Sequence, residues 1–176
     1  YYLKASAAAE AQGIKAREIY NPYKNTDMGN AERFYELASG DVKFVEELGW
    51  LLWNGKIWEV NPLGVKELYK HTVIERIYQE VAERASQHNS DAVKILNVWA
   101  KKSESDSQIA SALRCAASMS GIRANIEDFD KNLKLLNVEN GTVDLTTGEL
   151  KRHDRQDLIT KLAPVVRDAN AKAPVW

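Results

Sequence analysis

The chain has 176 residues, 44% of them hydrophobic and 28% charged, which is the composition of an ordinary globular domain. Its 24 Lys and Arg residues balance 25 Asp and Glu residues to a formal net charge of -1. This excludes a protein that holds nucleic acid through bulk positive charge. The single cysteine, Cys115, excludes an internal disulfide and fits a reducing compartment. No apolar run approaches the ~18 residues of a membrane span, so we expect a protein of the cytoplasm.

The first part of the chain predicts helices separated by a loop. Residues 3–20 are rich in alanine and predict a helix, with Gly13 as its weakest point. Residues 21–30 have the polar, Gly- and Pro-containing chemistry of a loop. A short helix is expected over 31–37, and Gly40 suits its C-cap.

The strongest hairpin signal is Asn54-Gly55 between two apolar runs, because this dipeptide favours a two-residue type I′ turn. The pairing would then be Trp53 with Lys56 and Leu51 with Trp58. One face would carry Leu51, Trp53 and Trp58, and the other Trp50, Leu52 and Ile57. Since both faces are apolar, we expect either other structure on both sides or one face presented to a partner.

Three helical segments are expected next. Asn61-Pro62 predicts the start of a helix of about 20 residues that reaches Ser86. Asn89-Ser90 starts a second helix, and Ser105 and Gln108 form a capping box for a third. Their apolar stripes are Ile74, Ile77, Tyr78, Val81 and Ala85, then Ala92, Ile95, Leu96, Trp99 and Ala100, then Ile109, Ala112, Leu113, Ala116 and Ala117. The last two helices predict a close antiparallel pair.

From Gly121 onward the hydrophobic period changes to that of strands. Asn140-Gly141 predicts a second two-residue turn that pairs Glu139 with Thr142. Leu136, Val138, Val143 and Leu145 would face inward, and Leu135, Asn137, Glu139, Thr142 and Asp144 would face mostly outward. A third strand over 149–153 completes a meander, and a last strand is expected over 158–166. The fold class is therefore α+β, mainly helical, with an N-terminal hairpin and a C-terminal meander in one compact unit.

The search for catalytic chemistry finds no convincing site. Residues 49–57 resemble a phosphate-binding loop but have five residues between the glycines instead of four, and Ile57 where a hydroxyl must reach magnesium. His71, His88 and His153 have no metal-ligand spacing, and Cys115 is interpreted as a small packing residue. Three acids could in principle hold a divalent metal, but a solvated turn is the favoured interpretation: Glu127, Asp128 and Asp130. We therefore expect no catalytic residue, bound cofactor or metal in this chain.

Several residues are candidates for contact with DNA or protein. One basic cluster comprises Lys151, Arg152, His153 and Arg155; Lys101-Lys102 stands at a helix end; and Arg114 and Arg123 flank another. Each is a candidate phosphate contact, although such a cluster is more often a solvated face. Trp50, Trp53 and Trp58 are candidate surface residues for a partner, although tryptophans are more often core residues.

Ordered motifs along the chain carry a family resemblance. They are Thr26-Asp27-Met28-Gly29-Asn30-Ala31-Glu32-Arg33-Phe34, the hairpin Trp50 to Trp58, Asp128-Phe129-Asp130, the stretch Leu135 to Leu150, His153, Asp157-Leu158-Ile159-Thr160-Lys161 and Ala173-Pro174-Val175-Trp176. In order and spacing they resemble the domain that precedes the superfamily-three helicase in phage and plasmid DNA primases and in the poxvirus primase-helicase. Ala173 departs from the cysteine that is frequent there.

The resemblance implies a replication protein of a mobile element. The chain begins at Tyr1 and closes on 173–176 without a polar tail, so we expect a fragment: an N-terminal extension over 1–25 and one connecting domain over 26–176. A helicase that uses ATP and magnesium would follow, and a primase module would precede. The implied partners are DNA, single-stranded or forked, the protein's own helicase and primase domains, and further copies, as in a hexamer.

Three functions stay open on the sequence. The first is a non-catalytic connecting domain that supports assembly of the helicase ring and guides DNA. The second is a protein-interaction collar without DNA affinity, which the near-neutral charge favours. The third is a small metal-dependent nuclease or hydrolase that uses Glu127, Asp128 and Asp130. Salt dependence separates the first two, because each phosphate contact adds about 0.9 to the log–log slope on duplex DNA and about 0.7 on single strands.

Overall fold

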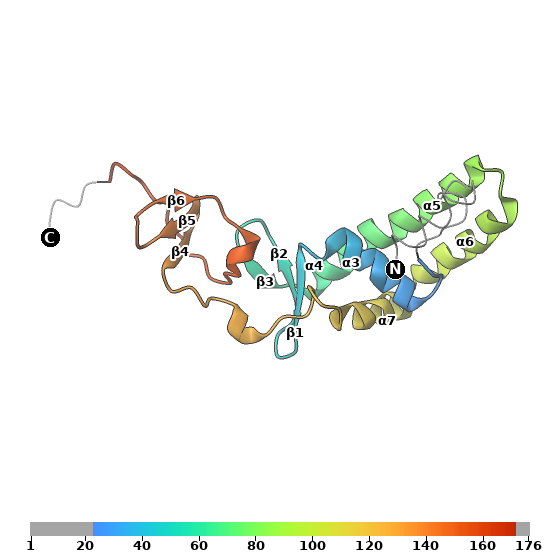
Figure 1. The fold of residues 1–176 in the computed structure, drawn as a ribbon, viewed down its shortest axis with the longest axis horizontal. Helices are drawn as coiled ribbons and strands as arrows, with labels where there is room; N and C mark the ends of the chain where they lie inside the picture. The colour runs from blue at the N-terminus through green and yellow to red at the C-terminus, as the bar shows by residue number, and fades with distance from the viewer. Residues whose placement is uncertain (1–22, 172–176) are drawn as a thin grey trace, which may run out of the picture.

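The computed structural model describes residues 23–171, so the expected helix over 3–20 and the closing residues 173–176 lie outside the described part. The chain forms an elongated α+β molecule (Figure 1), which confirms the expected fold class. A helical hairpin lies at one end, a small sheet lies at the other, and a second small sheet lies between them. The hairpin is α5 (Glu75–Ser86) and α6 (Ser90–Ser103), the middle sheet is β1 (Val42–Val45), β2 (Gly49–Trp53) and β3 (Trp58–Val60), and the end sheet is β4 (Leu135–Val138), β5 (Gly141–Asp144) and β6 (Leu150–Lys151).

Helix α3 (Asp27–Ala38) begins earlier than the expected residue 31. The reason is the side chain of Thr26, which accepts a hydrogen bond from the backbone N–H of Gly29 at 3.1 Å and so caps the helix. Gly29 admits no side chain, because a Cβ there would lie 1.9 Å from the carbonyl oxygen of Lys24. The helix ends on Ser39 in the right-handed region; Gly40, which is not left-handed, is not the C-cap that the sequence predicted.

The hairpin of β2 and β3 is present, but its register differs from the predicted one. Trp53 lies opposite Trp58, and the turn encloses Gly55 and Lys56, since the N–H of Asn54 donates to the carbonyl of Ile57 at 3.1 Å. The side chain of Asn54 also accepts from the backbone N–H of Ile57 at 2.9 Å, which holds this turn in place. The pairing moves by two residues, so the side chains within the strands keep their predicted faces, whereas Ile57 lies in the turn and not in the strand.

The middle sheet is shared by two hydrophobic cores. Trp50 and Leu52 on one face pack against a helical core, while Leu51 and Trp58 on the other face join a second core with Phe129. Other structure thus covers both apolar faces, as one of the two expectations for the hairpin required. Strand β1, which the sequence did not predict, adds the third strand by pairing antiparallel with β2.

A continuous helix confirms the expectation for residues 62–86. It consists of α4 (Pro62–Tyr69), a π-helical turn η1 (Lys70–Ile74) and α5. Helix α5 packs against α6, whereas α7 (Asp106–Ala117) packs against α3. The expected close pair of α6 and α7 is therefore wrong, because each of these helices packs mainly on another partner.

Two details of these helices differ from the predictions. Ile95, expected in the buried stripe of α6, is 61% exposed, because the α5–α6 hairpin extends beyond the rest of the helical core (Figure 1). Ala85, near the end of α5, is exposed for the same reason, whereas Tyr78 is exposed beside buried Ile77 and its hydroxyl donates to Glu104. The predicted capping box is wrong, since the hydroxyl of Ser105 donates to the carbonyl of Lys102 at 2.9 Å and makes no cap hydrogen bond to α7.

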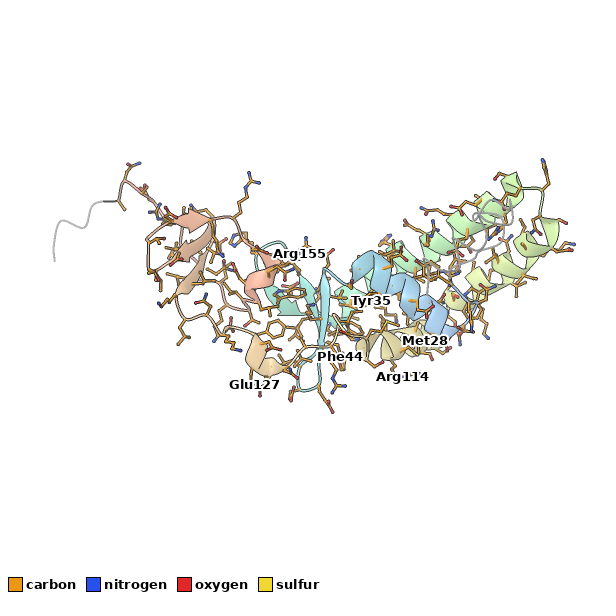
Figure 2. The ribbon with its side chains drawn as sticks, in the orientation of Figure 1. Met28, Tyr35, Phe44, Arg114, Glu127 and Arg155 are labelled. Atoms are coloured by element: carbon orange, nitrogen blue, oxygen red, sulfur yellow. The ribbon has the colours of Figure 1, made fainter. Side chains whose placement is uncertain are left out.

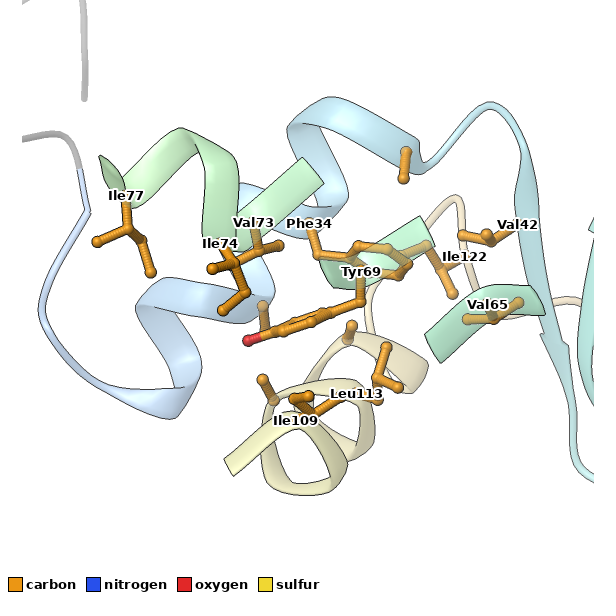
Figure 3. Packing of buried hydrophobic residues seen from close by; sticks show 14 of the residues in the cluster. Phe34, Val42, Val65, Tyr69, Val73, Ile74, Ile77, Ile109, Leu113 and Ile122 are labelled. Carbon is orange, nitrogen blue, oxygen red and sulfur yellow. The ribbon is translucent and has the colours of Figure 1, made fainter. Parts of the chain in front are cut away.

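Close packing around two rings builds the helical core (Figure 3). The rings of Phe34 and Tyr69 lie 5.6 Å apart between their centroids, and burial raises the pKa of the Tyr69 hydroxyl. Ala31 of α3 and Ala112 and Ala116 of α7 are buried, and such small residues let two helices approach closely.

The end sheet is the expected meander with a shifted register. Asn137 lies opposite Thr142 and Val138 opposite Gly141, so the two-residue loop is 139–140 rather than Asn140-Gly141. Gly141 belongs in the strand because a Cβ there would lie 2.3 Å from the carbonyl oxygen of Lys151 on β6. The close approach of a neighbouring strand, and not the turn, therefore requires this glycine.

The burial of the meander's two faces also differs from the prediction. Asn137 and Thr142, expected outside, are 3% and 1% exposed, and they bond to each other, with the Thr142 hydroxyl donating to the Asn137 amide oxygen at 2.8 Å. Leu136 and Leu145, expected inside, are 43% and 57% exposed. The sheet thus buries part of each face.

The last expected strand, over 158–166, does not form. The segment makes one bridge, between Val138 and Ala163, and the carbonyl of Ile159 accepts from the backbone N–H of Trp58 at 2.9 Å. It therefore follows an edge of each sheet in turn. Pro164 has no N–H to donate and so interrupts a ladder along β4.

Candidate nucleic-acid and protein interface

Helix α3 carries a buried polar network that sequence reasoning missed. The guanidinium of Arg33 meets the carboxylate of Glu80 on α5, with Nη2–Oε2 at 2.7 Å and Nε–Oε1 at 3.0 Å. Asn30 accepts a hydrogen bond from Trp99 at 3.2 Å and donates one to Ser103 at 2.9 Å, both on α6. These residues are buried, so they join α3 to the hairpin. In the sequence, the one indication of this network is an Asn and an Arg three residues apart, with Phe34 directly after the Arg.

The basic cluster 151–155 is largely paired within the chain. Lys151 Nζ lies 2.8 Å from a carboxylate oxygen of Asp157, and Arg155 Nη1 lies 2.5 Å from one of Asp41. The second pair ties the short helix η3 (Arg155–Asp157) to the residue before β1. Arg152 is exposed and makes no ion pair with any described residue. Of this cluster's cations, it is the one most open to a phosphate.

His153 belongs to a polar cluster rather than to the surface. Its Nδ1 lies 2.8 Å from the side-chain oxygen of Asn137, which also accepts from Thr142. The amide of Asn137 in turn donates to the carbonyl of Lys56 at 2.9 Å, and the ammonium of Lys56 lies 2.6 Å from Glu139. His153 therefore helps to dock the meander on the β2–β3 turn.

The remaining candidate cations are spread over the helical half. Arg123 lies 2.8 Å from Glu46, while Arg114 in the last turn of α7 is exposed and makes no ion pair with any described residue. Lys101 is exposed, and Lys102 lies 5.5 Å from the centroid of the Trp99 ring. Arg114 and Arg155 come from different parts of the molecule (Figure 2), so these charges do not form one patch.

The three candidate tryptophans take part in internal packing. Trp58 is 1% exposed, and its indole N–H donates to the carbonyl of Arg155 at 2.9 Å. The ring of Trp53 lies 5.8 Å from that of Trp58, and the ring of Trp50 lies 5.3 Å from that of Phe44. Trp50 and Trp53 keep some exposure, so a partner would reach their edges only.

The three candidate metal ligands serve local structure. Asp128 accepts from the backbone N–H of Asn125 at 3.2 Å, within the short helix η2 (Ile126–Asp128). Asp130 accepts from the N–H and the hydroxyl of Thr160, at 2.8 and 2.5 Å, and Glu127 is exposed. Within residues 23–171 no group of three or more His, Cys, Asp or Glu residues is placed to hold a metal ion.

The other residues singled out in the sequence have structural surroundings. His71 lies beside Glu67 and Glu75 on one helix face, and His88 stands with a φ of 56° where the α5–α6 hairpin turns. Cys115 is partly buried and packs against the helical core. Residues 49–57, which resemble a phosphate loop, are strand β2 and the turn that follows.

The end sheet carries an exposed apolar face that the sequence predicted to be buried. Leu136 and Leu145 lie on the same side of β4 and β5, because Leu136 is opposite Val143 and the N–H of Leu145 donates to the carbonyl of Lys134 at 2.8 Å. Leu133, which precedes β4, is also exposed. The sequence pattern located the apolar side correctly but could not tell how much of it the chain covers.

Comparison with known proteins matches most of the chain to one family. Residues 31–176 match a protein family described as "D5 N terminal like". A comparison with curated proteins found no match. No helix in the described part of the chain combines the length and the hydropathy that crossing a membrane requires.

Proposed function

The chain belongs to the D5 N-terminal-like family, whose domain precedes the helicase in phage and plasmid primase-helicases, and from this premise we propose that it is a non-catalytic accessory domain of a replicative primase-helicase. In that role it supports assembly of the helicase ring and guides DNA during replication. The family match over 31–176 is the observation that carries the proposal. ATP and magnesium would then bind the helicase domain, and the protein's own primase and helicase domains, further copies in a ring, and DNA would be its partners.

The structure supports a mechanical role through the way its two ends are joined. The middle sheet packs on the helical core with one face and on the second core with the other. Two ion pairs add further contacts to the middle sheet region. Arg155–Asp41 connects η3 to the residue before β1, and Lys56–Glu139 connects the β2–β3 turn to the β4–β5 turn. Side-chain contacts of this kind join the end sheet to the rest of the domain, which suits a role in positioning neighbouring domains.

A second candidate function is also consistent with the family but involves no contact with DNA. It is a protein-interaction collar without DNA affinity, and the ion pairs of Lys151, Arg155 and Arg123 favour it, because a cation that already has a carboxylate partner gains less from a phosphate. Under this candidate Arg114 and Arg152 are ordinary solvated charges.

Binding to fluorescent single-stranded and duplex DNA, at low and moderate salt, separates the two candidates. For the DNA-guiding domain we expect salt-sensitive binding that weakens in Arg114→Ala/Arg152→Ala, with a log–log slope on single strands smaller by about 0.7 for each phosphate interaction that the substitutions remove. Lys94→Ala is the control for loss of one positive charge, since Lys94 is an exposed cation on α6 that already has Asp91 as a partner at 3.8 Å. Binding that is absent at low salt, or equal in all variants, would support the collar.

A further inference from the structure

We infer that the exposed apolar face around Leu136 and Leu145 is the surface on which the helicase domain docks. This inference rests on the proposed function, because it takes the partner from the family's domain order. It goes further by naming the face that makes the contact and the kind of contact, which is apolar burial against one side of a small sheet.

The face is one continuous side of the meander that the chain covers only in part. Val138 and Val143 on this side are 2% and 9% exposed, and Val138 is bridged to Ala163 of the following segment. Leu136 and Leu145 on the same side remain 43% and 57% exposed. The rest of the chain therefore buries only part of this apolar surface. A second domain can bury the remaining part.

The position of this face indicates that the helicase domain is the partner that binds it. It lies on the end sheet, at the end of the elongated molecule where the described chain finishes (Figure 1). Arg167, close to that finish, is fixed to the β4–β5 turn by hydrogen bonds with the side chain of Asn140, at 3.0 Å in each direction. A helicase domain that follows in sequence is thus tethered at the turn end of the same small sheet that carries Leu136 and Leu145, and a tether raises its effective concentration near this sheet.

A second exposed apolar pair provides the comparison. Ile95 and Val98 on α6 are 61% and 70% exposed, but α6 belongs to the helical hairpin at the opposite end of the molecule (Figure 1). Exposure alone would favour this pair. Domain order favours Leu136 and Leu145, so the two pairs give opposite expectations for the same binding measurement.

The test titrates the separately produced helicase portion of the same protein with the 176-residue chain. We expect Leu136→Ser/Leu145→Ser to weaken binding at least about tenfold, since two leucines lose their burial in the interface. Ile95→Ser/Val98→Ser should stay within about twofold of the unchanged chain. Thermal unfolding of each variant checks that these surface substitutions leave the fold intact.

The outcomes separate the inference from the function on which it rests. Equal binding by all three chains overturns the docking face while leaving the accessory role in place. Weaker binding by the α6 variant alone assigns the interface to the helical hairpin. That result also overturns the inference about the end sheet. Failure of the unchanged chain to bind the helicase portion at all counts against both the inference and the proposed function.

Discussion

At the scale of single residues, the Arg33–Glu80 pair is a buried contact between α3 and α5. Its two side chains are 0% and 6% exposed, so removing one partner leaves a buried charge without compensation. We expect Glu80→Gln to lower the free energy of unfolding by about 3–5 kcal/mol. Equilibrium unfolding in urea measures this change.

Two further variants check that the loss comes from the uncompensated charge. Glu83, paired with Arg76 at 3.6 Å, is largely exposed, and Glu83→Gln should cost less than about 1 kcal/mol. Arg33→Met/Glu80→Met should cost less than the sum of its two single substitutions, because neither charge remains buried alone. An additive double variant would contradict the account of this pair.

At the scale of elements, the position of Gly141 in β5 explains the register of the meander. Gly141→Ala should destabilise the chain by more than Gly148→Ala, because a Cβ at 141 meets the carbonyl of Lys151 whereas one at 148 meets nothing within 4 Å. Both glycines have positive φ, 154° and 74°, so backbone strain alone costs about 1 kcal/mol at each. Urea unfolding of the two variants tests this order, and equal losses would contradict it.

The sequence predicted which elements form better than how they pair. Asn54-Gly55 and Asn140-Gly141 correctly marked hairpins, yet both turns formed with other residues in the loop. In the first hairpin the side chain of Asn54 reorganises the turn by accepting from Ile57, and in the second a neighbouring strand needs the glycine. Such contacts depend on tertiary structure, which a local turn preference does not include.

The sequence was sufficient to identify the residues of the candidate site, but not to predict whether they are free to contact a partner. The sequence identified Lys151, Arg155 and Arg123 as cations, but their partners Asp157, Asp41 and Glu46 lie in part far away along the chain. A charge pattern cannot reveal such pairs. The same holds for Leu136, whose inward orientation followed from alternation while its exposure depends on how far the segment after residue 158 covers the sheet.

At the scale of the whole molecule, one shared sheet connects two ends with different surfaces. The helical end presents Ile95 and Val98, and the end sheet presents Leu136 and Leu145. With a net charge of -1, the chain offers no dominant field to attract nucleic acid. Organisation of protein neighbours is therefore the central part of the proposed role, and DNA contact is the part that depends on Arg114 and Arg152.

Assembly of the helicase with and without this domain tests the central claim most directly. The mass of the helicase portion, alone and joined to this chain, would be measured by light scattering over a range of protein concentrations. The account predicts that ring-sized assemblies form at lower concentration when the domain is attached, because it adds contacts between neighbours. Identical assembly of the two proteins at every concentration would contradict it.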